Sequence, residues 1–215
     1  MNDTKHSIFF KMIRLDKILK MFAVLICMLI ISSSVFAVEV IGTLLYWESD
    51  GNDIRKFMNT TPYIYAETLG GYNQITLSSQ VTNAMNQWNG AGVPCNITSN
   101  SSSALVKVYG GTLSEIRTRV PSFLSNYAGL TLSSATKQTG VYVYNSSRKY
   151  LYKINSATIY ARSDNTYQQN VVTHEVGHSI GWAGHIPTSG NVMYSYMSSV
   201  TNLTTRDKRH LNQIH

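Results

Sequence analysis

The sequence predicts a single domain of the α+β class, in which a mixed sheet is covered by two helices. The chain has 215 residues, a length that suits one domain, and 43% of them are hydrophobic, which is enough to build a core. Short runs rich in β-branched and aromatic residues are interspersed with segments of helical periodicity. This order of elements is typical of a sheet that packs against helices.

Alternation and β-rich composition predict five strands. They lie at residues 43–47, 62–67, 105–109, 140–144 and 157–161. The segment 112–138 has no clear pattern, because Pro121 interrupts whatever helical periodicity it has. No element is therefore predicted there.

Three segments carry helical signals. In the first, apolar residues recur at helical spacing, at Val81, Ala84, Met85 and Trp88. Ser78 or Ser79 is expected to cap this helix, and Asn89-Gly90 is expected to end it. Two further helices are predicted over 168–180 and 205–214. The sequence thus places one helix among the strands and two after them.

The N-terminus has the pattern of a secretory signal peptide. A basic leader precedes an uncharged apolar run of 11 residues at 21–31, and small residues precede the expected cleavage site after Ala37. We therefore expect residues 1–37 to be removed, leaving a secreted domain of residues 38–215 with no stable membrane insertion. The alternative is an uncleaved N-terminus that tethers the protein to a membrane, but the run falls short of the roughly 20 apolar residues that span a bilayer. Residues 38–60 are either a short propeptide or the first strand.

The net charge of +7 says more about export than about partners. Five of the 18 basic residues precede residue 21, and thirteen basic and nine acidic residues are spread along the rest. No basic block with interleaved aromatic residues is present, so nucleic acid is not an expected partner. Cys27 would leave with the signal, and the mature chain would keep Cys95 alone, which excludes an internal disulfide. We expect Cys95 to be a buried core thiol.

One short stretch carries the chemistry. His174, Glu175 and His178 form the pattern His-Glu-x-x-His, and on a helix the two histidines project from the same face, one turn apart. Two imidazoles at this spacing can bind Zn²⁺. Glu175 lies close enough to meet a water on the metal without binding the metal itself, and a carboxylate there can act as a general base. Chance gives this pattern in well under ~1% of chains of this composition, so the sequence favours a zinc site.

A third protein ligand is expected downstream of the motif. Gly181 can end the helix in a left-handed conformation and turn the chain back toward the metal, and His185 lies four residues beyond it. No glutamate follows Glu175, which excludes a later glutamate as the third ligand. The other candidates are Asp207, His210 and His215. We favour His185 because it is nearest, and we expect the last two histidines to be solvated residues of the final helix and the chain end.

Residues 174–194 resemble the metzincin zinc peptidases, and the matrixin branch in particular. The family pattern His-Glu-x-x-His-x-x-Gly-x-x-His is matched by His174, Glu175, His178 and Gly181. His185 arrives one residue late, because Gly184 occupies the position of the family's third ligand. Downstream, Asn191-Val192-Met193-Tyr194 resembles the Met-turn that lies beneath the metal in this family.

The resemblance implies both a fold and an activity. The fold would be a metzincin-like twisted mixed sheet with an N-terminal helix near 81–88, an active-site helix and a C-terminal helix near 203–214. One catalytic Zn²⁺ would be bound by the three histidines, with Glu175 as general base for a zinc-activated water and Met193 as a hydrophobic floor under the imidazoles. The substrate would be a protein or peptide that pairs with an edge strand near 157–161.

Two functions from different classes follow from the sequence. The leading hypothesis is a secreted zinc metalloendopeptidase that hydrolyses peptide bonds. The alternative is a non-catalytic secreted or surface binding protein with a structural or degenerate zinc site, which the displaced His185 makes conceivable. Glu175 favours the enzyme, because a purely structural site has no use for an unligated carboxylate there. No Asp-rich loop indicates calcium, and the sequence leaves cleavage specificity, natural substrate and oligomeric state open.

Overall fold

A computed structural model describes residues 53–58, 60–145, 147–212 and 214–215. The predicted signal peptide and the strand expected at 43–47 lie outside these residues. Within the segment 38–60, Asp53–Lys56 forms a strand of the sheet, β1. In the part of the chain that the structure describes, no helix is both long and apolar enough to cross a membrane.

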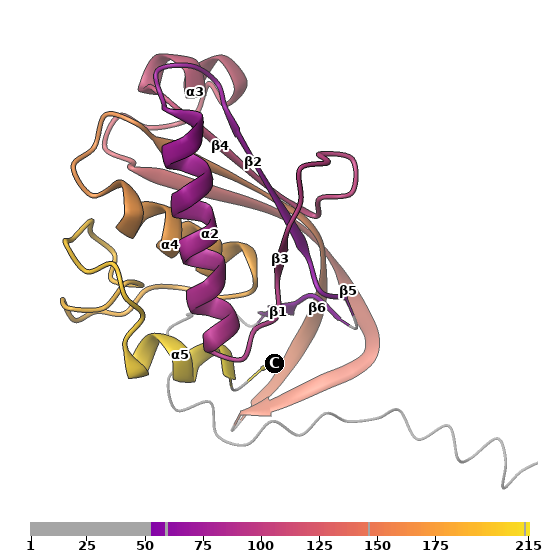
Figure 1. Ribbon diagram of the computed structural model, residues 1–215. Helices are drawn as coiled ribbons and strands as arrows, with labels where there is room; N and C mark the ends of the chain where they lie inside the picture. The colour runs from indigo at the N-terminus through magenta and orange to yellow at the C-terminus, as the bar shows by residue number, and fades with distance from the viewer. Residues whose placement is uncertain (1–52, 59, 146, 213) are drawn as a thin grey trace, which may run out of the picture. The chain divides into compact units, whose positions relative to one another are not determined.

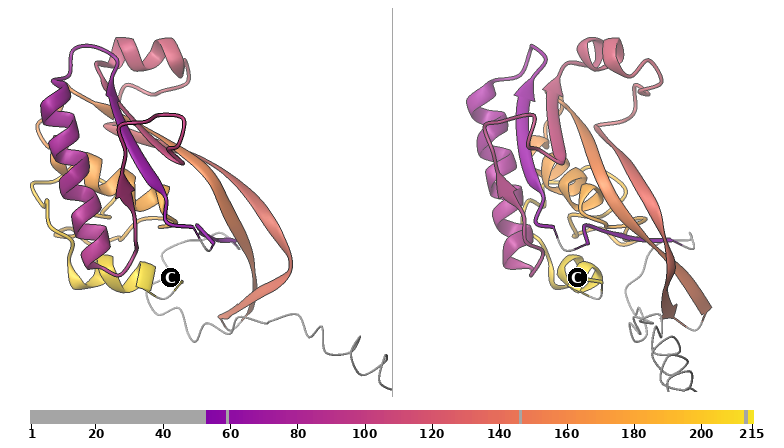
Figure 2. Two further views of the ribbon diagram at one scale, coloured as in Figure 1. Left: turned by 45° about the vertical axis from the view of Figure 1, so that its right-hand side comes forward. Right: turned by 90° about the vertical axis from the view of Figure 1, so that its right-hand side faces the viewer.

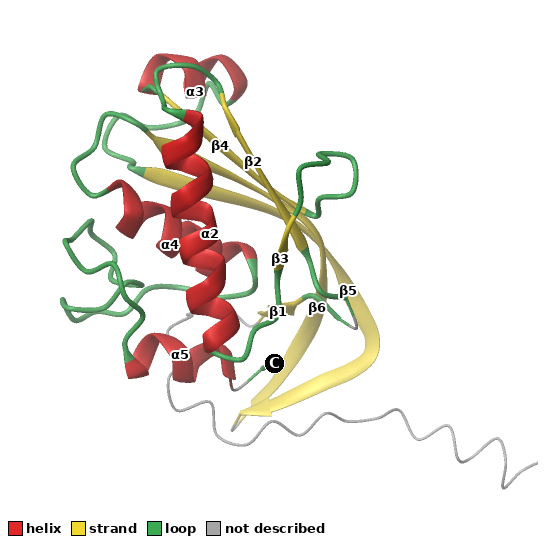
Figure 3. Ribbon diagram, in the orientation of Figure 1, coloured by secondary structure: helices red, strands yellow, loops and turns green. Residues whose placement is uncertain are grey.

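The described chain is a mixed α/β structure on a mostly parallel six-stranded sheet (Figures 1 and 3). Its strands are β1 (Asp53–Lys56), β2 (Tyr63–Thr68), β3 (Asn96–Ile97), β4 (Val106–Gly111), β5 (Gly129–Asn145) and β6 (Ser147–Arg162). Four helices lie in the described residues: α2 (Gln74–Gly90), α3 (Leu113–Arg119), α4 (Gln168–Ser179) and α5 (Thr205–Asn212). This set of strands and helices is compatible with the α+β class that the sequence predicts.

Strand β6 is the centre of the sheet. The strand order is β1-β6-β4-β2-β3, with parallel pairing throughout, and β5 pairs antiparallel with β6. Leu151 pairs with Ile54 of β1, Ile159 pairs with Val108 of β4, and all four side chains are buried. The expectation that residues 157–161 form the substrate edge is therefore wrong, because β4 and β5 flank them. Among the described strands β5 pairs only with β6, so β5 forms the edge on this side.

Helices α2 and α4 pack together on one side of the sheet (Figures 1 and 2). The buried face of α2 consists of Leu77, Val81, Ala84 and Trp88. The indole Nε1 of Trp88 donates a hydrogen bond to the carbonyl of Thr173 on α4, at 3.0 Å. The core lies between these two helices and the sheet, and α4 is thereby held rigidly above the strands.

Helix α2 begins earlier than the sequence predicts. Its N-cap is Asn73, whose side-chain oxygen accepts a hydrogen bond from the backbone N–H of Thr76 at 3.0 Å. The expected caps Ser78 and Ser79 lie inside the helix instead. Asn is among the best N-cap residues, and its hydrogen bond satisfies one of the donors that a helix start leaves open.

The segment without a predicted element, 112–138, contains α3 and the first half of β5. Thr112 and Glu115 form a capping box at the start of α3, in which each side chain accepts a hydrogen bond from the other residue's backbone N–H. The helix ends at Arg119, because the next residue, Val120, precedes Pro121, and the residue before a proline avoids the helical conformation.

Cys95 is buried in the core, as predicted. Burial raises the pKa of its thiol to about 12. The thiol therefore stays protonated at neutral pH, which suits a core residue and not a metal ligand.

Candidate metal centre

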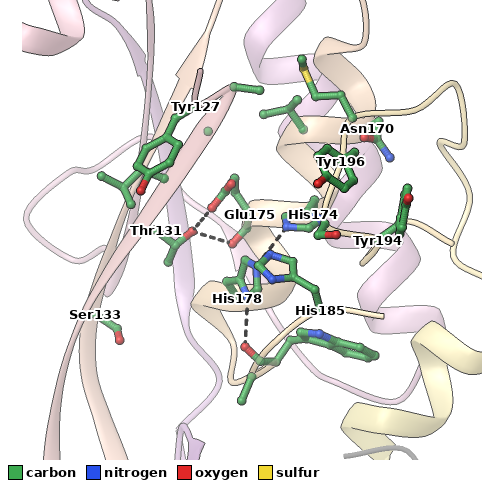
Figure 4. Close-up of a pocket in the computed structure, with 18 of the residues that line it drawn as sticks. Tyr127, Thr131, Ser133, Asn170, His174, Glu175, His178, His185, Tyr194 and Tyr196 are labelled. Carbon is green, nitrogen blue, oxygen red and sulfur yellow. Dashed lines mark hydrogen bonds between the residues drawn. The ribbon is translucent and has the colours of Figure 1, made fainter. Parts of the chain in front are cut away.

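Three histidines converge at the C-terminal half of α4 (Figure 4). The Nε2 of His178 lies 3.0 Å from the Nε2 of His174 and 3.3 Å from the Nε2 of His185. Zn–N bonds of about 2.0–2.1 Å at tetrahedral angles would separate neighbouring nitrogens by about 3.3 Å. The spacing of the three nitrogens thus matches one shared metal ion, and these three residues are close enough to bind it.

The other ring nitrogens fix the orientation of two of these imidazoles. Nδ1 of His174 donates to the carbonyl of Val192 at 2.8 Å, and Nδ1 of His178 donates to the carbonyl of Trp182 at 3.1 Å. A proton held on Nδ1 leaves the Nε2 lone pair directed at the centre, as in many metal-binding histidines. Burial lowers the pKa of His174 to about 4 and holds the pKa of His178 well below its usual value, so both rings are neutral near pH 7. The pKa of His185 is lowered by burial as well.

The turn after α4 explains how His185 reaches the other two. Gly181 has φ of +121° and Gly184 has φ of +73°, conformations that L side chains rarely adopt. The extra residue before His185, relative to the metzincin pattern, is thus absorbed by a loop with two positive-φ glycines. The one-residue displacement does not keep His185 from joining His174 and His178.

Glu175 projects from α4 toward the edge strand β5. The hydroxyl of Thr131 donates to its Oε2 at 2.6 Å, and a β carbon at Gly129 would lie only 2.6 Å from its Cγ and Oε1. Burial raises the pKa of Glu175 to about 7, although the Thr131 hydrogen bond opposes this rise. Neither residue of β5 was expected to contribute, because the segment 112–138 has no clear pattern in the sequence.

Met193 packs against α4 at Gly177, and Asp207 holds its turn. The side chain of Met193 is fully buried, and a β carbon at Gly177 of α4 would lie 2.8 Å from its sulfur. Buried Asp207 accepts hydrogen bonds from the backbone N–H groups of Val192 and Met193 at 3.1 and 3.0 Å. Asp207 and Thr204 also exchange hydrogen bonds in a capping box at the start of α5. The Thr-x-x-Asp spacing of this box is the signal in the sequence that could have revealed the structural role of Asp207.

The remaining candidate ligands do not join the three histidines. Asp207 binds the turn just described, and His210 is buried with its ring stacked on Trp182, at 3.6 Å between centroids. The expectation that His210 is solvated is therefore wrong. His215 is exposed, and its Nε2 lies 3.0 Å from the carbonyl of Ile180.

A cavity of about 620 Å³ opens beside the histidines. Residues 129–131 and Ser133 of β5 line one wall, and Tyr194, Tyr196 and Met197 of the loop after Met193 line another (Figure 4). Arg55 of β1 and Gly181 also line it. The cavity thus joins the candidate metal ligands, the carboxylate of Glu175 and an edge strand in one space.

Comparison with known proteins gives no family for this chain: no family model matches it, and no curated protein matches it either.

Proposed function

We propose that this protein is a secreted zinc-dependent endopeptidase of the metzincin type, resembling the matrixin branch. The observation that carries the proposal is the convergence of three histidine Nε2 atoms beside the buried carboxylate of Glu175 in an open cavity. Element positions support the same conclusion. The matrixin-like segments near 81–88 and 203–214 overlap helices α2 and α5, and the His-Glu-x-x-His motif lies on α4.

The three histidines fit zinc in donor chemistry and in number. Neutral imidazole nitrogens are common Zn²⁺ ligands, and three protein ligands leave a fourth position open, as catalytic zinc sites require. The Nε2 spacings of 3.0 and 3.3 Å suit one ion. When bound, Zn²⁺ would act as a Lewis acid that lowers the pKa of a water and polarises a carbonyl.

Glu175 would act as the general base. Its pKa of about 7 lies near neutral pH, where a carboxylate can both take a proton from the attacking water and release it to the leaving amine. The Thr131 hydroxyl at 2.6 Å from Oε2 would hold the carboxylate in place during these transfers. Glu175 is not one of the three candidate ligands, so its carboxylate remains available to act as the general base.

The substrate would be an extended segment of a protein or peptide. Strand β5 provides an edge on which such a segment can add as a further strand, with main-chain hydrogen bonds giving affinity. Large apolar side chains near this edge remain exposed, namely Tyr127, Leu132, Tyr196 and Met197. They offer contacts for substrate side chains on either side of the scissile bond.

Substitution of Glu175 tests the proposal. The purified wild-type protein should bind one zinc ion and cleave a denatured protein substrate. Glu175→Gln should keep the zinc and cleave about 10²–10⁴-fold more slowly, the usual contribution of a general base. His185→Ala should lose zinc affinity, whereas His215→Ala, a histidine outside the triad, should keep it. Stoichiometric zinc with no cleavage of any peptide library by the wild type would refute the peptidase and favour a non-catalytic binding protein.

A further inference from the structure

One wall of the cavity is a loop that is exposed along its middle. Four consecutive residues of this loop line the cavity, and we call them the wall segment: Tyr194, Ser195, Tyr196 and Met197. The side chains of Tyr196 and Met197 are 70% and 45% exposed, so little packing holds them in place. The position of this wall must therefore be set at the two ends of the segment.

The first end of the wall segment is fixed by the turn that precedes it. The carbonyl of Val192 accepts a hydrogen bond from Nδ1 of His174 at 2.8 Å. The carbonyl of Met193 accepts a hydrogen bond from the N–H of Ile186 at 2.8 Å. This end of the segment is thus tied directly to a candidate metal ligand on α4.

The second end is fixed to the same helix by one side chain, that of Asn170. Its Oδ1 accepts a hydrogen bond from the N–H of Ser198 at 3.2 Å, and its Nδ2 donates to the carbonyl of Val200 at 2.6 Å. The hydroxyl of Ser198 accepts from the N–H of Val200 at 3.3 Å, which closes a compact turn. Asn170 is only 2% exposed, and a buried amide is costly unless its polar atoms are bonded. The two bonds to the loop meet this requirement.

Asn170 also relates the wall to the candidate metal ligands. It precedes His174 by four residues on α4, so the two side chains project from the same face of the helix, one turn apart. Asn170 itself lines the cavity, and Figure 4 shows it with Tyr194 and Tyr196 across the histidines from Thr131. A wall that is bonded to α4 at both ends keeps a constant distance from the histidines of that helix.

We propose that Asn170 is a positioning residue that sets the size selectivity of this cavity, by fixing the wall segment relative to the candidate metal ligands. The proposal rests on the proposed peptidase function and adds a determinant of its specificity. The wall presents two tyrosines and a methionine, so the substrate group that it selects is an apolar side chain beside the cleaved bond. A wall fixed at both ends rejects a side chain that is too large, whereas a wall released at the second end yields to it.

Capped peptides with Ala, Leu or Phe on each side of the cleaved bond test the proposal. In the wild type, kcat/KM should differ at least about ten-fold between the best and the worst of these residues at one position, as expected of a fixed apolar pocket. Asn170→Leu keeps the branched shape of the side chain but loses both hydrogen bonds. This variant should keep its zinc and reduce the ratio to below about three-fold, with KM changing more than kcat.

Gln87→Met is the matched control. Gln87 of α2 binds the same loop with the same pair of hydrogen bonds, from its Nε2 to the carbonyl of Thr201 and from the N–H of Leu203 to its Oε1, each at 2.8 Å. Thr201 and Leu203 are not among the residues that line the cavity. Gln87→Met should therefore lower the urea midpoint, as Asn170→Leu does, but leave the substrate ratio unchanged.

Hydrogen exchange measured by NMR gives a result that does not depend on cleavage. In the wild type, the amide of Ser198 should be protected at least about ten-fold more than the amide of Met197, and Asn170→Leu should remove this difference. Equal protection of the two amides in the wild type overturns the role of Asn170 alone. A wild-type substrate ratio in Asn170→Leu, or an equally reduced ratio in Gln87→Met, overturns it as well. If the wild type cleaves none of the peptides, the peptidase function itself fails, and the size selectivity fails with it.

Discussion

Replacement of Asp207 should loosen the candidate metal centre, although Asp207 is not one of its three candidate ligands. Its fully buried carboxylate accepts hydrogen bonds from the backbone N–H groups of Val192, Met193 and Thr204, at 3.1, 3.0 and 2.8 Å. The carbonyl of Val192 in turn accepts the Nδ1 proton of His174 at 2.8 Å. A change at Asp207 is therefore transmitted to a candidate metal ligand, His174, through one short turn.

The size of the effect follows from the hydrogen bonds. In Asp207→Asn, the amide oxygen can replace the Oδ2 that accepts from Val192 and Thr204, but the amide nitrogen then faces the N–H of Met193. Two buried donors would oppose each other, at a cost of about 2–4 kcal/mol in the free energy of unfolding. Asp207→Ala leaves all three N–H groups without their acceptor and should cost about 3–5 kcal/mol. Loss of the support behind His174 should weaken zinc binding about 10–100-fold.

Urea denaturation in the presence of a chelator measures the first effect, and competition with a chromophoric zinc chelator measures the second. Asp164→Asn is the matched control, because Asp164 pairs with Arg162 at 2.7 Å on the surface and should contribute less than about 1 kcal/mol. An Asp207→Asn protein with wild-type unfolding free energy and wild-type zinc affinity would refute the reasoning that the buried carboxylate supports the turn.

Two further predictions concern β5 and the core thiol. In Gly129→Ala the new methyl group would meet the Glu175 carboxylate at 2.6 Å. Zinc content should be unchanged while kcat/KM falls about 10²-fold, as expected for a misplaced catalytic group. Wild-type activity would contradict this prediction. The pKa of Cys95 rises from 9.0 to about 12 in the folded protein. Above pH 9 the unfolded chain therefore loses the thiol proton while the folded chain keeps it. The free energy of unfolding falls as the pH rises toward 12. Urea midpoints at about pH 8 and pH 10 should therefore fall less for Cys95→Ala than for the wild type, and an equal fall would contradict the buried protonated thiol.

Elements with an apolar, buried face could be predicted from the sequence. Val81, Ala84 and Trp88 mark α2 because each of them is fully buried against the sheet and α4. The start of the same helix could not be placed, since its first turn carries exposed Ile75 and polar residues with no periodic signal. There the Asn73 side chain determines the boundary through a single hydrogen bond.

The first part of β5 could not be predicted, although the strand expected at 140–144 lies within its last part. An edge strand buries little apolar surface. Leu132 is 47% exposed, and polar residues occupy most of the positions from Thr131 to Gln138. The antiparallel pairing with β6 supplies the hydrogen bonds that make this segment a strand. The composition of the segment itself therefore does not predict a strand, because the strand depends on its pairing with β6.

The same contrast explains which parts of the candidate site were visible in the sequence. His174, His178 and His185 lie within twelve residues, so helical spacing and one turn suffice to bring them together. The contacts that tune the site join residues far apart, 44 positions between Thr131 and Glu175 and 78 between Arg55 and Ser133. Such contacts depend on the packing of the whole sheet.

These distant contacts converge on β5, which gives that strand a specific part in the proposed reaction. Gly129 and Thr131 limit the position of the Glu175 carboxylate, and Ser133 orients the guanidinium of Arg55. A substrate that adds to the edge of β5 would be aligned by the same backbone that positions the base. A shift of β5 along β6 would therefore misplace the base and the substrate together. Because β6 is paired with β1 and β4 as well, the core holds β6 in place and sets this register.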